Sequence, residues 1–139
     1  MTQNPDTEKP TLFPYLVYRD AETAFNWLAN VFGFRKTAEV LGPDGHILHA
    51  ELSFGAGVIM LGTASDEQLE QSPWNLPGGH GIYVYVEDLD THYERARANG
   101  AKIVYPPEDT QWGMRRYRAL DLDGYEWSFG TYRPSGEEQ

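Results

Sequence analysis

The sequence predicts an α+β fold in which two modules, each with the element order β-α-β-β-β, pack around one cleft. Each half of the chain contains a segment with the spacing of an amphipathic helix, and strand-like segments precede and follow it. In addition, Gly33 and Gly57 in the first half are as far apart as Gly100 and Gly124 in the second, and each pair brackets corresponding elements. This spacing indicates an internal repeat.

The first half begins with a strand-like segment at 11–18 and continues into a helix. Asp20 is expected to cap the N-terminus of this helix, and Gly33 is expected to end it in a left-handed conformation. The apolar residues of the helix recur at helical spacing and are Ala21, Ala24, Phe25, Leu28, Val31 and Phe32. Three further strands are expected at 34–41, 47–54 and 58–61, joined by turns at 43–45 and 55–57.

The second half repeats this order, beginning with a Tyr- and Val-rich strand at 81–87. Asp88 is expected to open the second helix and Asn99-Gly100 to stop it, with a buried stripe of Leu89, Tyr93 and Ala96. The remaining strands are expected at 101–105, 114–122 and 125–132, the last two joined by a turn at Asp123-Gly124. Neither copy can bury its sheet face alone, so the two modules are expected to pack together.

The predicted boundaries give one domain at 10–133, with modules at 10–62 and 80–133 and a linker at 63–79. A chain of 139 residues suits one such domain, since domains cluster near ~100–150 residues. Residues 1–9 and 134–139 are polar and rich in Pro, Gly or Glu, and we predict that they are flexible tails.

Composition excludes several classes of function. Lys and Arg total 11 against 21 Asp and Glu, and a net charge of −10 argues against a nucleic-acid partner but suits a cationic ligand or simple solubility. The absence of cysteine excludes disulfides, thiolate metal sites and a cysteine nucleophile. Apolar runs such as 58–61 are too short to cross a membrane, and residues 1–9 lack a signal-peptide core, so we expect a cytoplasmic protein without a membrane partner.

Seven short stretches, taken in this order and spacing, resemble the vicinal oxygen chelate superfamily, and within it the glyoxalase/bleomycin-resistance protein/dioxygenase family with PhnB-like features. They are PYLV at 14–17, FGF at 32–34, HAEL at 49–52, VEDLD at 86–90, GA at 100–101, WG at 112–113 and DLDGYEW at 121–127. The resemblance covers about residues 12 to 132. It implies that each module curls its sheet into half of one cleft, with the helices outside, and that two chains pair as a homodimer.

In metal-dependent members of that family, the metal ligands come from the first and last strand of each module. Aligning the two halves by their helix caps and glycines places Phe13, Met60, Gly81 and Ser128 at these positions. None of them offers an imidazole, carboxylate or thiolate donor. We therefore expect no metal and no other cofactor, which removes the group that polarises the substrate in the metal-using enzymes.

Strand alternation sorts the residues of 47–54 into two faces. The face expected against the helix comprises Leu48, Ala50, Leu52 and Phe54, and the face expected toward the cleft comprises Ile47, His49, Glu51 and Ser53. His49 and Glu51 would then be neighbours that could hydrogen-bond a ligand or exchange a proton with it. They are the candidate catalytic residues, although a solvated strand face could equally carry such a pair.

Alternation in 81–87 turns Tyr83 and Tyr85 toward the cleft, where Phe13, Tyr15 and Met60 would complete an aromatic and thioether wall. The rings could instead fill a narrow cleft that holds no ligand. Ser128 is expected on the cleft-facing side of its strand and is a further candidate for ligand binding.

Trp74 and Trp112 lie in loops or at a strand start, where packing does not readily explain a large ring, so both are candidates for stacking on a flat ligand. Arg116 and Arg118 share one side of their strand and Arg115 faces the other. We include Arg116 among the candidate ligand-binding residues because a guanidinium group could clamp a carboxylate or phosphate. Which of the three arginines faces the cleft stays open.

The sequence therefore favours a metal-independent protein that binds a small organic molecule, flat or cationic, and that would sequester a toxic or antibiotic-like ligand. A lyase, isomerase or dioxygenase-like enzyme is the alternative, either metal-free with His49 as the general base or metal-dependent through His49, Glu51 and His80. A third possibility is a domain that serves only as an interaction module. His80 is otherwise expected at the cleft rim, and His46 and His92 on the surface.

Overall fold

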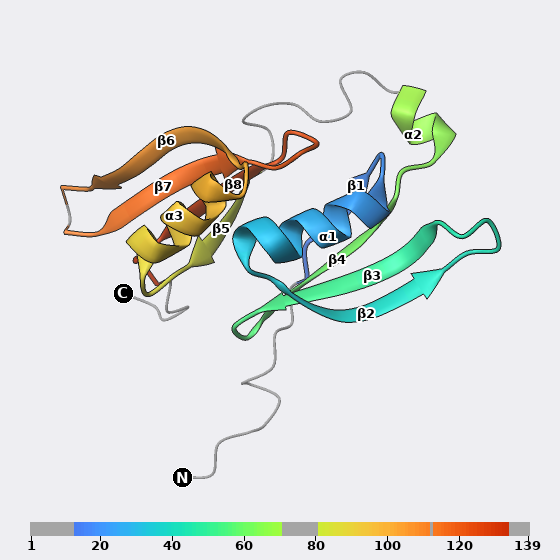
Figure 1. Ribbon diagram of the computed structural model, residues 1–139, viewed down its shortest axis with the longest axis horizontal. Coiled ribbons are helices and arrows are strands. Elements are labelled where there is room, and N and C mark those ends of the chain that lie inside the picture. The colour runs from blue at the N-terminus through green and yellow to red at the C-terminus, as the bar shows by residue number, and fades with distance from the viewer. Residues whose placement is uncertain (1–12, 71–80, 112, 134–139) are drawn as a thin grey trace, which may run out of the picture. The chain divides into compact units, whose positions relative to one another are not determined.

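The computed structural model describes residues 13–70, 81–111 and 113–133. The chain divides into two compact units, Met1–Trp74 and Asn75–Gln139, here called the first and second unit. Each contains one four-stranded mixed sheet with a long helix against it, which confirms the predicted α+β fold (Figure 1). No helix within the described ranges is long and apolar enough to span a membrane.

The first unit has its strands in the spatial order β1-β4-β3-β2, with β1 parallel to β4 and the other neighbours antiparallel. Its elements are β1 (Tyr15–Tyr18), α1 (Ala21–Phe32), β2 (Arg35–Leu41), β3 (Ile47–Phe54), β4 (Gly57–Thr63) and α2 (Asp66–Glu70). The short helix α2 lies within the segment predicted to be a linker.

Helix α1 forms where its capping residues and apolar spacing predict it. The Asp20 carboxylate accepts hydrogen bonds from the backbone N and the side-chain hydroxyl of Thr23, at 3.1 and 2.7 Å, and Gly33 ends the helix with a φ of 82°. All six apolar residues predicted to face the sheet are buried. They pack over Leu52 and Leu61 on the inner face of the sheet, which forms the core of the first unit.

The start of β3 departs from simple alternation. Ile47 is 1% exposed and Leu48 is 60% exposed, the reverse of the sequence-based expectation. The cause is a shift in the β2–β3 register between Val40 and Leu41, which turns Ile47 inward. Beyond the bulge, Ala50 and Leu52 are buried as predicted.

The second unit repeats the sheet, in the order β5-β8-β7-β6. Its elements are β5 (Gly81–Tyr85), α3 (Leu89–Ala98), β6 (Lys102–Asp109), β7 (Arg115–Leu120) and β8 (Glu126–Gly130). Strand β6 runs four residues past its predicted end at Tyr105, through Pro106 and Pro107. It can do so because it is an edge strand, where proline breaks no ladder of hydrogen bonds on the open side.

The core of the second unit is aromatic and contains polar atoms. Tyr117, Trp127 and Phe129 are fully buried. His92, expected on the surface, is buried instead, because its helical position turns Nδ1 to within 2.6 Å of the Tyr117 hydroxyl oxygen. Asp121, expected only in a hairpin turn, is also buried and accepts a hydrogen bond of 2.9 Å from Trp127 Nε1.

Strand register relates the two units residue by residue. In the first, Tyr15 lies opposite Met60, and Met60 opposite Glu51. In the second, Tyr83 lies opposite Ser128, and Ser128 opposite Arg118. Corresponding residues of the two units are 68 positions apart in the first and fourth strands, as in Tyr15 and Tyr83, and 67 apart in the third strands, as in Glu51 and Arg118. The chain from Arg118 to Ser128 is accordingly one residue longer than the chain from Glu51 to Met60.

Candidate ligand-binding site

A pocket of about 520 Å³ opens on the second unit, a size within the range of roughly 300–1,000 Å³ typical of small-molecule sites. It lies where the β6–β7 connection and the segment after β8 meet β5. The described residues that line it are Tyr83, Thr110, Met114, Arg115, Arg116 and Tyr132. The sequence singled out Tyr83 and Arg116 as ligand-binding candidates but missed Thr110, Met114 and Tyr132.

The Tyr83 ring lies across β8 because Gly130 has no side chain there. A Cβ atom at Gly130 would come within 2.7 Å of the Tyr83 hydroxyl oxygen. The hydroxyl donates a hydrogen bond to the backbone carbonyl of Tyr132, and burial raises the pKa of the phenol above its usual value. With its proton donated to the protein, Tyr83 offers a ligand mainly the apolar surface of its ring.

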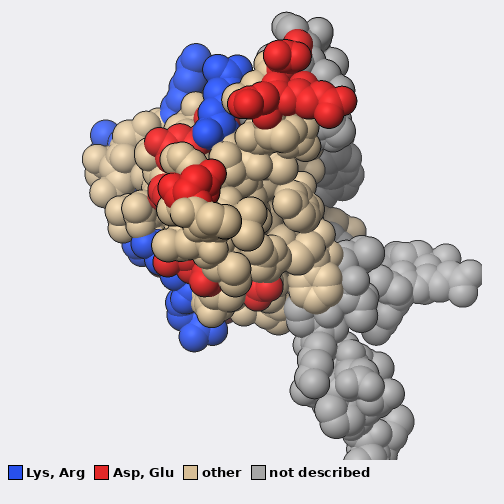
Figure 2. Space-filling model, turned by 90° about the vertical axis from the view of Figure 1, so that its right-hand side faces the viewer, with Lys and Arg blue, Asp and Glu red and all other residues tan. Residues whose placement is uncertain are grey.

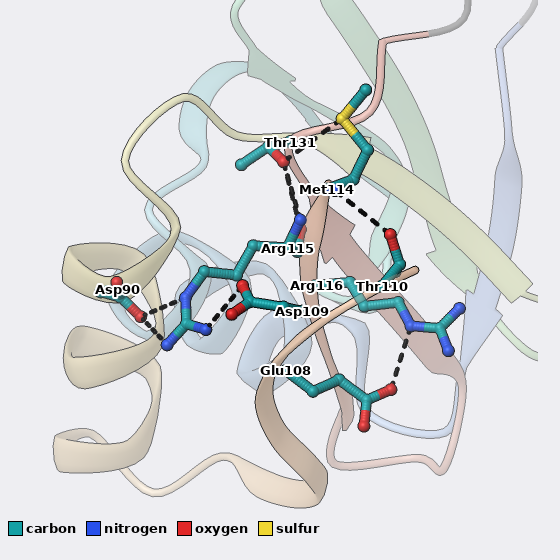
Figure 3. A network of polar contacts seen from close by, with 8 residues as sticks. All are labelled: Asp90, Glu108, Asp109, Thr110, Met114, Arg115, Arg116 and Thr131. Carbon is teal, nitrogen blue, oxygen red and sulfur yellow. Dashed lines mark hydrogen bonds and ion pairs between the residues drawn. The ribbon is translucent and has the colours of Figure 1, made fainter. Parts of the chain in front are cut away.

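The end of the β6–β7 hairpin holds Met114 at the pocket edge (Figure 3). Thr110 N donates to the Met114 carbonyl at 2.7 Å, and Met114 N donates to the Thr110 hydroxyl at 3.2 Å. The Thr131 hydroxyl lies 4.0 Å from the Met114 sulfur and accepts a hydrogen bond from Arg115 N at 3.0 Å. These contacts fix a soft, polarisable thioether beside the pocket.

All three guanidinium nitrogens of Arg115 donate to two carboxylates. Its Nε and Nη2 donate to Asp90 Oδ1 at 3.2 and 3.1 Å, and its Nη1 donates to Asp109 Oδ1 at 3.0 Å. The hydrogen bonds to Asp90, and then those to Asp109, raise the pKa of this guanidinium group. Arg115 thereby links the first turn of α3 to the end of β6.

Arg116 points to the other side of β7 and is only partly engaged (Figure 3). Its Nε donates to Glu108 Oε1 at 3.1 Å, and its guanidinium carbon lies 5.7 Å from the centre of the Tyr105 ring. Among the described residues, nothing accepts a hydrogen bond from its Nη1 or Nη2. These nitrogens can bind a planar anionic group in the fork geometry that guanidinium provides.

Two other ligand-binding candidates of the second unit, Ser128 and Tyr85, lie outside the described lining of this pocket. The Ser128 hydroxyl accepts a hydrogen bond of 2.9 Å from Arg118 Nε, and Arg118 also lies 3.9 Å from Glu126. The Tyr85 ring carries the Arg133 guanidinium 4.8 Å from its centre. Gly81, which the sequence aligns with a metal-ligand position of the family, stands at the start of β5.

The first unit brings His49 and Glu51 together on the face of its sheet opposite α1. His49 Nε2 donates to Glu51 Oε2 at 2.7 Å, and the two side chains are 34% and 37% exposed. Glu51 lies beside Met60 in the strand register, and Tyr15 crosses β4 at Gly62, as Tyr83 crosses β8 at Gly130. An imidazole held by a carboxylate in this way can act as a general base.

A second pocket, of about 560 Å³, lies at the start of α1 and has acidic walls. Its lining includes Asp20, Glu22, Asp44 and Asp66, and His46 Nδ1 contacts Glu22 Oε1 at 3.2 Å. Acidic side chains also gather in separate groups on the face of the molecule shown in Figure 2. Within the described parts of the chain, no three His, Cys, Asp or Glu side chains are arranged to hold a metal ion.

Several predicted residues stay untested. Trp74, His80 and Trp112 lie outside the described residues. Phe13 lies before β1 and is exposed. The one cleft expected between the two modules stays a prediction, because the pocket described here is lined by residues of the second unit.

Known proteins with similar sequences and structures indicate the family of this chain. TioX from Micromonospora sp. ML1 has a similar structure, with a TM-score of 0.73, 35% identity and coverage of 89% of this chain and 99% of that chain. An uncharacterized protein of Mycobacterium tuberculosis is 32% identical over 126 residues, 88% of this chain and 74% of the relative. A glyoxalase/bleomycin resistance protein from Streptomyces sp. CB03234 shares the fold at 19% identity, with a TM-score of 0.64 and coverage of 84% of this chain and 96% of that chain.

Residues 11–129 match the family described as Glyoxalase/Bleomycin resistance protein/Dioxygenase superfamily. The match spans both sheets, and it confirms the resemblance found in the sequence, while the PhnB-like features stay a prediction. This chain belongs to the Glyoxalase/Bleomycin resistance protein/Dioxygenase superfamily.

Proposed function

We propose that this protein binds a small, flat organic molecule in the pocket of the second unit, needs no metal ion to do so, and acts by sequestering that molecule. The pocket carries this proposal. Its described walls combine two tyrosine rings, a thioether and two arginine side chains, a mixture of apolar surface and a few polar groups that suits an organic ligand. The bleomycin-resistance branch named in the family description supports a toxic or antibiotic-like ligand.

The expected affinity is modest because the pocket is open. Tyr83, Met114 and Tyr132 are all exposed to solvent in part. A ligand of about 20 non-hydrogen atoms that gains ~0.3 kcal/mol per atom would bind with ~6 kcal/mol, a Kd in the tens of micromolar. Titrations should therefore reach several hundred micromolar where solubility allows.

The test is a fluorescence titration with N-phenylnaphthylamine, a flat, neutral probe that brightens in apolar surroundings. We expect saturable binding to the native chain and a Kd about fivefold higher for Met114→Ala, because that change removes apolar surface worth ~1 kcal/mol from the pocket edge. Leu122→Ala is the matched control, since Leu122 is 38% exposed against 36% for Met114 and lies outside the described pocket lining. Absence of saturable binding, or equal effects of the two variants, would contradict the proposal.

The His49–Glu51 contact favours a second candidate function, a metal-free enzyme with His49 as general base. Mass spectrometry of a bound compound after long incubation distinguishes the two. A binding protein returns the compound unchanged. An enzyme converts it, and His49→Gln would abolish the conversion while His46→Gln, which changes another histidine paired with a glutamate in the same unit, would not.

The metal-dependent alternative involves His80, which lies outside the described residues. Elemental analysis of the purified protein tests it directly. One equivalent of nickel, zinc, iron or manganese per chain would overturn the metal-independent proposal.

A further inference from the structure

We propose that the ligand of the second unit's pocket carries a planar or compact anionic group, such as a carboxylate or sulfonate, and that Arg116 binds it. This inference rests on the proposed function and adds the chemical class of the ligand. It departs from the cationic ligand that the net charge of −10 would favour, because the charged hydrogen-bond donors that line the pocket are guanidinium groups, which bind anions.

The two arginines of the pocket differ in the donors they have left. Arg115 places all three guanidinium nitrogens on Asp90 and Asp109 and is therefore structural. Arg116 uses only Nε, on Glu108, and this single contact leaves both Nη groups available among the residues described. An anion at Nη1 and Nη2 would receive two parallel N–H donors, the strongest arrangement that a guanidinium group offers.

The surroundings hold Arg116 in position without consuming those donors. Its guanidinium group lies against the Tyr105 ring, which Arg118 also contacts at 5.4 Å, so two positive charges share one aromatic side chain. Arg118 donates to Ser128 and lies 3.9 Å from Glu126, while the one polar partner of Arg116 among the described residues is Glu108, at 3.1 Å. Each of the two arginines has one carboxylate partner, so it is the unused Nη donors of Arg116 that favour an anion.

The described lining of the pocket also favours an anion over a cation. It contains two arginines and, within the described ranges, neither an aspartate nor a glutamate. The nearest carboxylates given by the contacts, those of Asp90, Glu108 and Asp109, are already paired with Arg115 or Arg116. A cationic ligand would therefore find no carboxylate among these groups that is not already paired with an arginine.

Two fluorescent probes that differ in one group test this inference. Anilinonaphthalene sulfonate and N-phenylnaphthylamine share their ring systems, and only the first carries a sulfonate. We expect Arg116→Gln to raise the Kd of the sulfonate probe about tenfold and to change the Kd of the neutral probe less than about twofold. Arg118→Gln is the matched control, because it removes the same charge from the same strand face and the same Tyr105 ring, outside the described pocket lining.

The outcomes separate this inference from the proposed function. If the neutral probe binds in the pocket but Arg116→Gln weakens the binding of both probes equally, or of neither, the proposed ligand-binding function is supported and the assignment of Arg116 is wrong. If Arg116→Gln and Arg118→Gln weaken the sulfonate probe to the same extent, the effect is one of general charge and the inference is also wrong. If neither probe binds the native chain, both proposals fall.

Discussion

The two units of this protein share one backbone plan and carry different chemistry on it. The corresponding row across the sheet face opposite the helix reads Tyr15, Met60 and Glu51 in the first unit and Tyr83, Ser128 and Arg118 in the second. Where the first unit has His49 beside Glu51, the second has Arg116 beside Arg118. The pockets follow this difference, with acidic walls in the first unit and arginines in the second.

The cores differ in the same way. The buried pair Ala50 and Leu61 in the first unit corresponds to Tyr117 and Phe129 in the second. The first core also buries the rings of Phe25 and Phe32, but at this pair it depends on close aliphatic packing, whereas the aromatic pair of the second core also has a buried polar contact, that of Tyr117 with His92. The comparison indicates that the repeated fold constrains where side chains lie, and leaves the kind of force that stabilises each unit free to vary.

The largest expected effect is at Asp121, whose counterpart in the first unit is Phe54. The Asp121 carboxylate accepts hydrogen bonds from Trp127 Nε1, Asp123 N and Tyr125 N at 2.9 to 3.1 Å. Asp121→Ala leaves these buried donors without their partner, and we expect a loss of ~3 kcal/mol in the free energy of unfolding. Asp121→Asn, which keeps an acceptor, should lose about half as much. Denaturant unfolding measures both, and a loss under ~1 kcal/mol for the alanine variant would contradict the comparison of the cores.

The next effect is at Tyr117, which replaces Ala50 in the second core. Tyr117→Phe removes the contact with His92 and should lower stability by ~1 kcal/mol at neutral pH. Burial raises the pKa of Tyr117 well above its usual value, so the unfolded chain loses this proton first and the native protein loses stability as pH rises above ~10. The phenylalanine variant has no such proton to lose, so by pH 11 the difference in free energy of unfolding between the native protein and the variant should shrink by ~1 kcal/mol. Tyr132→Phe, on an exposed tyrosine, serves as the control and should show no such change.

A further difference, also of about 1 kcal/mol, is expected between Gly62 and Gly130. A Cβ at Gly130 meets only the Tyr83 side chain, which can move, whereas a Cβ at Gly62 meets the Tyr15 hydroxyl at 2.9 Å and the Leu48 backbone carbonyl at 3.0 Å. We expect Gly62→Ala to cost ~1–2 kcal/mol, and Gly130→Ala to cost less because reduced freedom of the unfolded chain offsets a movable clash. Gly130→Ala should nevertheless weaken the binding of N-phenylnaphthylamine, because it displaces Tyr83 from the pocket wall. Equal losses of stability in the two variants would contradict this prediction, since they would show that Tyr15 at Gly62 and Tyr83 at Gly130 are equally able to move.

The smallest expected difference is between the two helix caps. Asp20 and Asp88 each accept hydrogen bonds from the backbone and the hydroxyl of the threonine three residues on, at 3.1 and 2.7 Å in α1 and at 3.3 and 2.8 Å in α3. Replacing either by alanine should cost ~1 kcal/mol. Thermal unfolding should give losses that agree within ~0.5 kcal/mol, and a larger disparity would mean that the helices contribute unequally beyond their caps.

The sequence predicted the elements that local signals define, and missed those that depend on distant partners. The caps at Asp20 and Gly33 and the buried stripe of α1 follow from residues within one helix. His92 could not be placed because its partner Tyr117 is 25 residues away, and Leu48 could not because strict alternation takes no account of a bulge.

The candidate site was predicted only in part, for the same reason. Tyr83 and Arg116 sit within strands, where alternation assigns a face. Thr110 lies outside every predicted strand. Met114 and Tyr132 stand at the ends of the predicted strands 114–122 and 125–132 but just outside β7 and β8, where alternation no longer determines the direction of a side chain. The donors still available on Arg116 become visible only once Glu108 and Tyr105 are in place beside it.

The one-residue difference in spacing between the two units begins where the chain leaves the helix, persists through the third strand, and is cancelled at the hairpin between the third and fourth strands. A chimera that exchanges segments between the halves must therefore join them at the end of α1 or α3, or at the tip of the β3–β4 or β7–β8 hairpin. A junction placed inside a strand by counting residues at a constant interval would turn each core side chain beyond it to the solvent.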